Sequence, residues 1–309
     1  MSLIHYTRCA VCLGKHIHPV LDAKDHTVSE SVFSIWHCKD CSFRFTQDIP
    51  SIENIGTYYQ STNYISHSNT KKGIVNKLYH LVRNYTLGTK ARLLQKVTGL
   101  EKGNLLDIGA GTGAFANTMK QKGWNVTALE PDAIARNEAQ KNYGLELELP
   151  ARLFEFGPNS FDAISMWHVI EHVHDLVAYM RQLNKVIRDK GRLIIAVPNY
   201  TAADAATYGK YWAAYDVPRH LHHFSPSSME IMGDLHGFRL VATKAMWFDA
   251  YYVAMLSEQY KNGRPHLIRA LWQGLKSNFK AISNEKKCSS VIYIFEKKLF
   301  IGPIEFQKE

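Results

Sequence analysis

The chain has 309 residues, 46% of them hydrophobic, and a formal net charge of +9. This length can bury a sizeable core and allows one α/β domain with an additional lobe. No apolar run approaches the ~18 residues that a membrane span needs, and the N-terminus lacks a signal-peptide pattern. We therefore expect no membrane span and a cytoplasmic location.

Much of the positive charge lies near the C-terminus, where residues 261–309 hold ten Lys and Arg against four Asp and Glu. Such a segment suits a nucleic acid, an anionic lipid head group or a nucleotide-linked substrate, or it forms a solvated basic face. The lysines are scattered in the sequence rather than stacked with aromatic residues. That scatter favours the solvated face.

Four of the five cysteines form two Cys-x-x-Cys pairs, Cys9 with Cys12 and Cys38 with Cys41. Two such pairs can place four thiolates around one tetrahedral zinc ion. Disulfides fit poorly with a cytoplasmic chain, and neither pair opens a helix in a βαβ unit as a redox motif would. We predict a zinc ribbon over residues 1–50 that needs its metal to fold.

Residues 51–98 are predicted to connect this ribbon to the rest of the chain. Their first part, residues 56–68, is rich in aromatic and hydroxyl side chains and has no clean period, which indicates an ordered loop. From residue 74 to residue 97, apolar side chains recur at a period close to 3.6. We expect a helix there, interrupted near Gly88 and ended by Gly99.

The most informative feature is an apolar strand that runs into an acidic residue and three alternating glycines. The strand ends at Ile108, and Gly109, Gly111 and Gly113 let the backbone turn tightly and approach a ligand. A dinucleotide-binding turn also fits this spacing. Asp107 argues against it, because a pyrophosphate gains nothing from a nearby carboxylate, whereas a cationic ligand does.

The segments that follow alternate between helix and strand, as a doubly wound sheet requires. The strand over 124–129 ends in Glu130 and Pro131, where a carboxylate can accept two hydrogen bonds from a ribose diol. We expect helices at 114–122, 132–142 and 175–189, the last ended by Gly191. We expect strands at 192–197, 237–242 and 291–296. Residues 250–284 are predicted to form an inserted helical cap.

His168, Glu171 and His172 match the His-x-x-Glu-His zinc signature of one metallopeptidase class. That signature needs a helix with both histidines on one face, whereas here the motif follows the apolar run 163–166, which has the pattern of a strand. The peptidase interpretation is therefore rejected. The simplest role for Glu171 and His172 is capping and packing.

Four segments in this order, residues 105–113, 159–164, 167–172 and 192–199, resemble the class I S-adenosylmethionine (SAM) methyltransferases. The resemblance implies a doubly wound, mostly parallel seven-stranded sheet within a domain over 99–309, closed by an antiparallel edge strand at 291–296. It also implies cofactor contacts by the glycine turn and its neighbours, by the strand end and by later segments: Asp107, Gly109, Ala110, Gly111, Gly113, Glu130, Pro131, Arg152 and Trp167.

Two further expectations come from the same resemblance. Tyr59 and Tyr64 are candidates to close over the methionine part of SAM, with packing between the two lobes as the alternative. Some quinone O-methyltransferases with a similar Glu-His pair are thought to hold a divalent metal, so a metal at Glu171 and His172 is an alternative to packing.

The acceptor site is predicted in residues 211–225, which follow the fifth strand at the sheet edge where ligands bind. Three histidines within four positions, an arginine and an aspartate offer bases, an anion clamp and possible metal ligands. We predict that Asp216, Arg219 and His220 face His168 across the donor methyl, with His220 as the general base. Alternatively, His220 packs the loop, while the other two histidines, His222 and His223, cap the helix start at 225–227.

The sequence thus predicts a SAM-dependent methyltransferase that acts on oxygen, carbon or nitrogen of a small molecule or nucleotide-linked sugar. Zinc-ribbon methyltransferases with a similar Pro-Arg-His-Leu segment are often encountered in bacterial cell-surface sugar pathways. One alternative is an RNA methyltransferase that uses the ribbon to bind RNA, although residues 198–200 lack the Asn-Pro-Pro-Tyr arrangement of base methylation. Another alternative is a SAM-binding adaptor without turnover.

Overall fold

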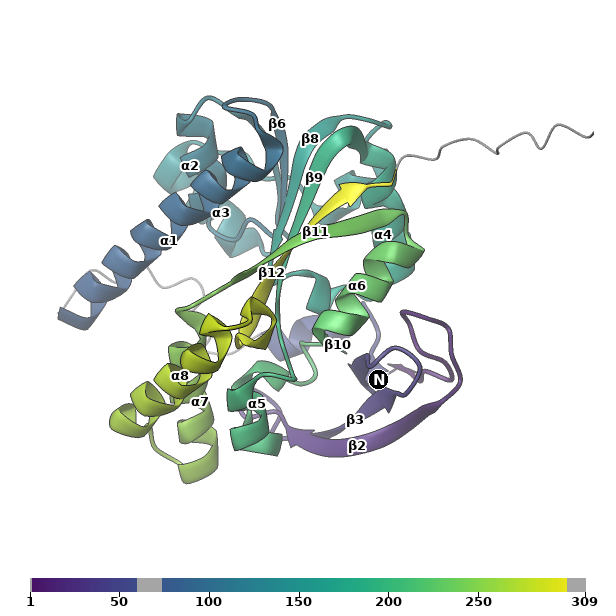
Figure 1. Cartoon of the computed structure of the whole chain (residues 1–309), viewed down its shortest axis with the longest axis vertical. Coiled ribbons are helices and arrows are strands. Elements are labelled where there is room, and N and C mark those ends of the chain that lie inside the picture. The colour runs from purple at the N-terminus through teal and green to yellow at the C-terminus, as the bar shows by residue number, and fades with distance from the viewer. Residues whose placement is uncertain (1, 60–73, 299–309) are drawn as a thin grey trace, which may run out of the picture.

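A six-stranded sheet lies at the centre of the molecule in the computed structural model, which describes residues 2–59 and 74–298 (Figure 1). The strand order is β11-β12-β9-β8-β6-β7. Four strands are parallel, and β12 runs antiparallel to both of its neighbours. The strands are β6 (Asn104–Ile108), β7 (Asn125–Leu129), β8 (Phe161–Trp167), β9 (Ile187–Pro198), β11 (Phe238–Ala245) and β12 (Ser290–Lys297).

The predicted doubly wound, mostly parallel sheet is confirmed, with two differences in its strands. The position of a seventh strand beside β7 holds only an isolated bridge between Leu129 and Glu148. The strand β12 was expected at the edge and lies between β9 and β11 instead. Its first six residues are all buried, and a strand that is apolar on both faces needs a neighbour on each side.

Helices cover both faces of the sheet (Figure 1). One side holds α1 (Ile74–Thr98), α2 (Ala114–Gln121) and α3 (Ala133–Tyr143), and the other holds α4 (Leu176–Val186) and α6 (Pro226–Leu235). Asp132, Asp175 and Ser225 cap the first turns of α3, α4 and α6 with side-chain hydrogen bonds. These caps satisfy backbone N–H groups that have no partner inside the helix.

Two of the predicted helix boundaries are wrong. The helix α1 continues through Gly88 and ends before Gly99, which has a φ of 69°. Ala91 and Leu94 bury that helix against the sheet, which offsets the cost of about 1 kcal/mol for one internal glycine. Gly191 does not end a helix. It lies inside β9, where an added Cβ would come within 2.6 Å of the Ile187 side chain.

The N-terminal lobe is built on a small antiparallel sheet, and one strand of this sheet comes from the second half of the chain. Its own strands are β2 (Ile17–Lys24), β3 (Val32–Cys38) and β4 (Arg44–Thr46), and β1 (Leu3–Ile4) pairs with β5 (Ile49–Pro50) beside them. The strand β10 (His222–His223) pairs with β4 and completes the sheet. The expected acceptor segment is therefore attached to this lobe by backbone hydrogen bonds.

A helical cap stands between β11 and β12, as predicted, and packs beside the short helix α5 (Ala203–Tyr208). It consists of α7 (Asp249–Asn262) and α8 (Leu267–Ile282). The buried carboxylate of Asp204 in α5 accepts hydrogen bonds from Trp212, Ser277 and Ser289. The remaining helical turns are η1 (Ile55–Tyr59), η3 (Pro150–Glu155), η4 (Ile170–His172), η5 (Gly209–Tyr211), η6 (Ala213–Tyr215) and η7 (Glu285–Lys287). Within the described residues, no helix combines the length and apolarity needed to span a membrane.

Candidate active site and metal centre

The glycine turn follows β6 directly and sits at the carboxyl edge of the parallel strands. Gly109, Gly111 and Gly113 have φ values of 70°, 55° and 76°, which only glycine adopts without strain. A Cβ on Gly109 would lie 2.3 Å from the Val169 side chain, whereas one on Gly111 would meet no atom within 4 Å. The turn is thus packed at its start and open at its middle, which is the shape that lets a ligand approach the backbone.

Glu130 holds this turn from the neighbouring strand. Its Oε2 accepts a hydrogen bond of 2.7 Å from the Gly111 N–H, and its Oε1 accepts one of 3.0 Å from the Asp132 N–H. The Arg136 guanidinium donates to the carbonyls of Glu130 and Pro131. The Ala110 N–H donates to the Leu129 carbonyl. The carboxylate at the end of β7 is therefore fixed within the open part of the turn.

Asp107 is buried beneath the same turn. Its Oδ1 accepts a hydrogen bond of 2.6 Å from the Ser165 hydroxyl, and its Oδ2 has no hydrogen-bond partner among the described residues. Burial raises the pKa of Asp107 to about 7, although the Ser165 bond and the charge of Lys90 oppose this rise. A cation bound nearby would complete the missing contact.

The other residues expected to contact a cofactor are spread around this edge. Arg152 is exposed and pairs with Glu148 and Glu155. Trp167 packs edge-on against Phe115, with Lys90 Nζ lying 4.3 Å from the centre of its ring. These two side chains therefore contact protein groups in this structure, and Tyr64 lies outside the described residues.

His168 is held between two carboxylates. Its Nε2 lies 2.9 Å from Asp249 at the start of α7, and its Nδ1 lies 3.3 Å from Glu171. Burial alone would lower the pKa of His168, but the hydrogen bonds and charges of these carboxylates raise it to about 10. His168 is thus a cation that links the cap to the sheet. Glu171 contacts His168 and also belongs to a group with His220, and the arrangement of His168 and His220 across a donor methyl stays a prediction.

Glu171, His172 and His220 form a compact group, with one ligand atom of each within 4.8 Å of the others. The two imidazole rings stand edge to face, 4.6 Å apart. Burial and the neighbouring His220 lower the pKa of His172 to about 4. The buried carboxylate of Glu171 is paired with the His168 cation. That pairing offsets its charge, but Glu171 Oε2 has no hydrogen-bond partner among the described residues, so a metal at Glu171 and His172 stays an untested alternative to packing.

Both imidazoles in this group have one nitrogen committed to a carbonyl oxygen. His220 Nδ1 lies 2.8 Å from the Ala214 carbonyl, and His172 Nδ1 lies 2.9 Å from the Arg219 carbonyl. A carbonyl can only accept, so each Nδ1 carries a hydrogen, and in the neutral form of either ring the lone pair is on Nε2. The hydroxyl of Tyr59 lies 3.0 Å from His172 Nδ1, which brings the predicted connector residue to the acceptor side of the site.

Asp216 and Arg219 bind each other. The guanidinium donates to both carboxylate oxygens of Asp216, and it also donates to the Tyr58 carbonyl. The Arg219 side chain is only 3% exposed. Asp216 Oδ2 also lies 3.8 Å from His220 Nε2. The pair therefore positions His220 and η1, and Arg219 has its charge balanced by Asp216.

His222 and His223 support the loop from inside. His222 Nε2 donates a hydrogen bond of 2.7 Å to the Val173 carbonyl, and His223 Nε2 lies 3.1 Å from the Thr46 hydroxyl. Burial lowers the pKa of His222 to about 3, and burial also lowers the pKa of His223. Ser225 itself caps α6, so the expectation that these histidines cap it is wrong. They are neutral parts of β10.

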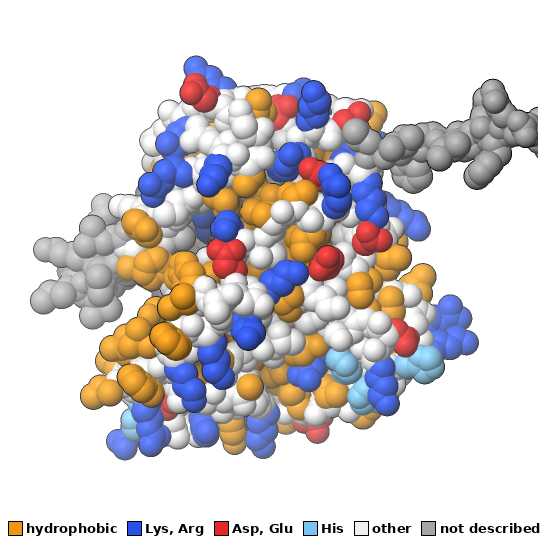
Figure 2. Space-filling model, viewed as in Figure 1, with side chains coloured by type: hydrophobic (Ala, Val, Ile, Leu, Met, Phe, Trp, Pro, Cys, Tyr) orange, Lys and Arg blue, Asp and Glu red, His pale blue; other side chains and the backbone are white. Residues whose placement is uncertain are grey.

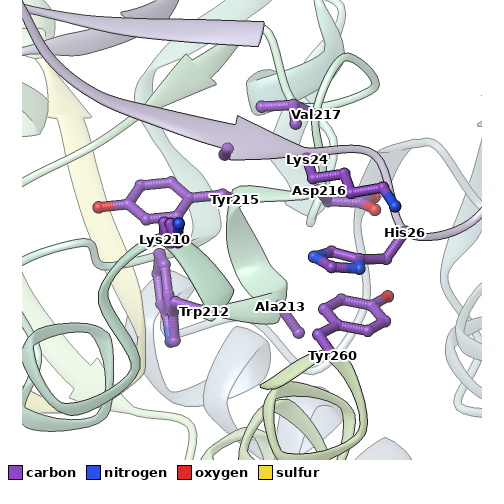
Figure 3. A pocket seen from close by; sticks show the side chains of 10 residues that line it. Lys24, His26, Lys210, Trp212, Ala213, Tyr215, Asp216, Val217 and Tyr260 are labelled. Atoms are coloured by element: carbon purple, nitrogen blue, oxygen red, sulfur yellow. The ribbon is translucent and has the colours of Figure 1, made fainter. Parts of the chain in front are cut away.

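A small pocket lies beside Asp216, where the N-terminal lobe, the acceptor loop and α7 meet (Figure 3). The ring of His26 stacks on that of Tyr260, with 4.3 Å between their centres. Lys24 and Lys210 also line the pocket. Its volume of about 10 Å³ admits one water molecule. This pocket is a narrow gap where the N-terminal lobe, the acceptor loop and α7 meet. It is too small to hold an acceptor.

The four predicted cysteine ligands converge in the N-terminal lobe. Sγ of Cys9 lies 3.5 Å from Sγ of Cys41, and Sγ of Cys12 lies 3.6 Å from Sγ of Cys38. All four sulfur atoms are within 4.8 Å of one another. A tetrahedral ion with Zn–S bonds of about 2.3 Å requires S···S distances near 3.8 Å. The arrangement therefore fits zinc and is too open for disulfides, whose sulfur atoms are about 2 Å apart.

Comparison with known proteins assigns this architecture to a family. The model of the family described as "Methyltransferase domain" matches residues 80–243, just over half of the chain. Two solved structures, from Pyrococcus horikoshii OT3 and Galdieria sulphuraria, share the fold with TM-scores of 0.50 and 14% identity each. They cover 78% and 72% of this chain, and 98% and 88% of their own chains, respectively.

Curated relatives match more narrowly. Demethylmenaquinone methyltransferase of Tropheryma whipplei (strain Twist) is 28% identical over 129 residues, which cover 40% of this chain and 54% of the relative. Ubiquinone biosynthesis O-methyltransferase of Rickettsia conorii is 26% identical over 234 residues, covering 66% of this chain and 79% of the relative. The chain thus spans about half the length of the first of these relatives.

The charge of His168 can be tested by its titration. We expect the nitrogen NMR signals of His168 to be those of an imidazolium at pH 8, and Asp249→Asn to lower the pKa. Because the folded pKa of about 10 exceeds the ordinary 6.5, this charge stabilises the fold fully below pH 6.5. The stabilisation is lost as the pH rises toward 10.

Denaturation in urea at several pH values measures the same effect. Between pH 7 and pH 9.5, the wild type should lose more unfolding free energy than Asp249→Asn does. The exposed Asp22→Asn should behave as the wild type. A His168 resonance that titrates near pH 6.5 would contradict the bridge.

Proposed function

We propose that this chain, which belongs to the methyltransferase domain family, transfers a methyl group from SAM to a small-molecule acceptor. The prediction of a methyltransferase is confirmed at the level of the family. The proposal rests on one observation: the open glycine turn with Glu130, and the His172–His220 pair, lie at the same carboxyl edge of the sheet. Open parallel sheets bind their ligands at that edge.

The residues around the turn fit SAM. The space beside Gly111 is open, and Asp107 has a carboxylate oxygen that lacks a protein partner among the described residues. We infer that Asp107 and the glycines hold the methionine part and that Glu130 holds the ribose. SAM supplies a methyl group activated by its cationic sulfur. The chain then has to align the acceptor with this methyl group and exclude water between them.

His220 is the group that we propose as the base. Its Nδ1–H donates to the Ala214 carbonyl, so Nε2 is the nitrogen that would take a proton from the acceptor. Asp216, whose Oδ2 lies 3.8 Å from that nitrogen, stabilises the resulting imidazolium. A base is needed only for a protonated acceptor of high pKa, which favours a hydroxyl group. The O-methyltransferase name of the Rickettsia relative agrees with this choice.

The acceptor itself is best sought among small molecules, including nucleotide-linked sugars and reduced quinones. The test is to incubate the protein with labelled SAM and fractionated extracts, and to identify the labelled product by mass spectrometry. We expect label in the small-molecule fractions. Label confined to RNA would instead support the RNA alternative, and no labelled product in any fraction would support the adaptor.

Replacement of Glu130 tests the cofactor site. Loss of hydrogen bonds to a charged group should cost about 1.5 to 3 kcal/mol, so Glu130→Ala should bind SAM roughly 10- to 150-fold more weakly. Isothermal calorimetry measures this change. The control is Glu138→Ala in α3, a partly exposed carboxylate that accepts a hydrogen bond from Asn142, and it should bind SAM as the wild type does. If SAM affinity is unchanged in Glu130→Ala, or NAD binds more tightly than SAM, the assignment fails.

Replacement of His220 tests whether this residue is the general base. The substrate in this test is the acceptor identified with labelled SAM. We expect His220→Ala to lower turnover by roughly two to four decades and to leave SAM affinity almost unchanged. The control His236→Ala, at the end of α6, should keep full turnover. If His220→Ala lowers both the melting temperature and the affinity for SAM, the ring only packs the loop.

We also propose that Cys9, Cys12, Cys38 and Cys41 bind one structural zinc ion. Elemental analysis should find one zinc per chain in the wild type and in Cys288→Ser, a buried thiol outside the group, and less in Cys9→Ser. Because β4 pairs with β10, loss of zinc should also lower methyl transfer. A folded, fully active protein free of zinc would refute this proposal.

A further inference from the structure

We propose that α8 binds the surface of a lipid bilayer that carries anionic head groups. The helix presents its largest apolar side chains to solvent: Ile268 is 87% exposed, Phe279 is 75% exposed and Trp272 is 67% exposed. These three lie on one face with three further exposed residues, Leu271, Leu275 and Ile282. A continuous exposed face of this kind marks an interaction site.

The orientation of α8 is fixed by contacts on its opposite side, which carries small residues. An added Cβ on Gly274 would lie 2.5 Å from the Tyr251 ring, so α7 and α8 pack closely there. Ser277 donates a hydrogen bond of 2.7 Å to buried Asp204, and Asn278 donates one of 2.7 Å to the Trp247 carbonyl. Rotation of the helix would break these bonds. The outward apolar face is therefore built into the fold.

A basic stripe runs beside the apolar face. Arg269, Lys276 and Lys280 are exposed, and at 3.6 residues per turn they share one side of the helix. The segment Leu267–Ile282 contains no Asp or Glu. Hydrophobic side chains and Lys or Arg side chains lie next to each other over α7 and α8 in the lower left of Figure 2. The scatter of lysines in the sequence thus becomes an ordered stripe in the structure.

The apolar face and the basic stripe together indicate what binds to α8. An amphipathic helix of this composition lies in the interface plane of a bilayer, with its apolar face among the acyl chains and its cations at anionic head groups. A second copy of this chain packed antiparallel on the same face would bring two basic stripes together, which repel. Trp247 and Phe248, 40% and 43% exposed at the start of α7, add aromatic side chains suited to the same interface.

Binding of α8 to a bilayer would also place the candidate active site relative to the bilayer, whatever the acceptor is. The other helix of the cap, α7, begins at Asp249, which is bound to His168 at the edge of the sheet. The elements that would touch the bilayer are therefore rigidly joined to the candidate active site. A bilayer on α8 would lie on the cap side of that site.

Co-sedimentation of the full chain with vesicles tests the proposal. We expect binding to vesicles of phosphatidylcholine mixed with phosphatidylglycerol, and at least about tenfold weaker binding to phosphatidylcholine alone or in high salt. The double variant Ile268→Ser/Phe279→Ser should lose binding. The double variant Lys276→Gln/Lys280→Gln should bind the anionic vesicles on the order of tenfold more weakly and with less dependence on salt.

Two matched controls carry the same chemical changes elsewhere. Leu235→Ser/Val241→Ser replaces exposed apolar residues of α6 and β11, and Lys120→Gln/Lys122→Gln removes charges at the end of α2. Both should bind vesicles as the wild type does. Thermal melting checks that all variants are folded.

Three results would overturn the proposal. The first is a wild type that does not bind the anionic vesicles, and the second is equal binding to both vesicle types. The third is a dimer, seen by light scattering, that Ile268→Ser/Phe279→Ser dissociates, because that result assigns the face to a second copy of the chain.

Discussion

The backbone pairing of β4 with β10 is the constraint on which the candidate site depends. It joins Arg44–Thr46 in the cysteine lobe to His222–His223 in the acceptor loop. Thr46 makes three further contacts: its N–H donates to the Leu221 carbonyl, its hydroxyl donates to the His220 carbonyl, and that hydroxyl also lies 3.1 Å from His223 Nε2. One residue of the lobe thereby fixes the backbone that carries the proposed base. The lobe is in turn anchored to the rest of the molecule, because its cysteines, Phe43 and Phe45 pack in the same buried cluster as the sheet.

A row of buried and partly buried charges is the second constraint on the site. Asp107, Lys90, Asp249, His168 and Glu171 alternate in sign between the glycine turn and the acceptor side. Each opposite neighbour offsets part of the cost of removing a charge from water. The alternation explains why a histidine beside the cofactor edge is cationic while His172, a few residues away, is neutral. The ion pair between His168 and Asp249 also joins the cap to the sheet. It fixes the orientation of the cap more specifically than a purely apolar contact would.

Much of this architecture could be predicted because its signals are local. The turn at 109–113 and the helices that begin near residues 132 and 175 could be predicted from local pattern, and the convergence of the four cysteines follows from the chemistry of their pairs. The errors concern partners that are distant in sequence. Asp249 lies 81 residues from His168, so no pattern near the histidine indicates the bridge that changes its role. The place of β12 in the sheet and the continuity of α1 at Gly88 were likewise decided by tertiary packing rather than by local propensity.

The position of the cap within the sheet has an architectural consequence. β11 and β12 are adjacent and antiparallel, and their last pair before the cap is Ala245 with Val291. Everything between these residues is topologically the loop of a β-hairpin, which a turn of a few residues could close without altering the strand order. The helices α7 and α8 are therefore an insertion that can be replaced without changing the sheet. Different insertions at this position would place different surfaces beside the same catalytic edge. A replacement would still need a carboxylate next to His168, as Asp249 provides. The His168–Asp249 ion pair is therefore the contact that any other insertion would have to preserve.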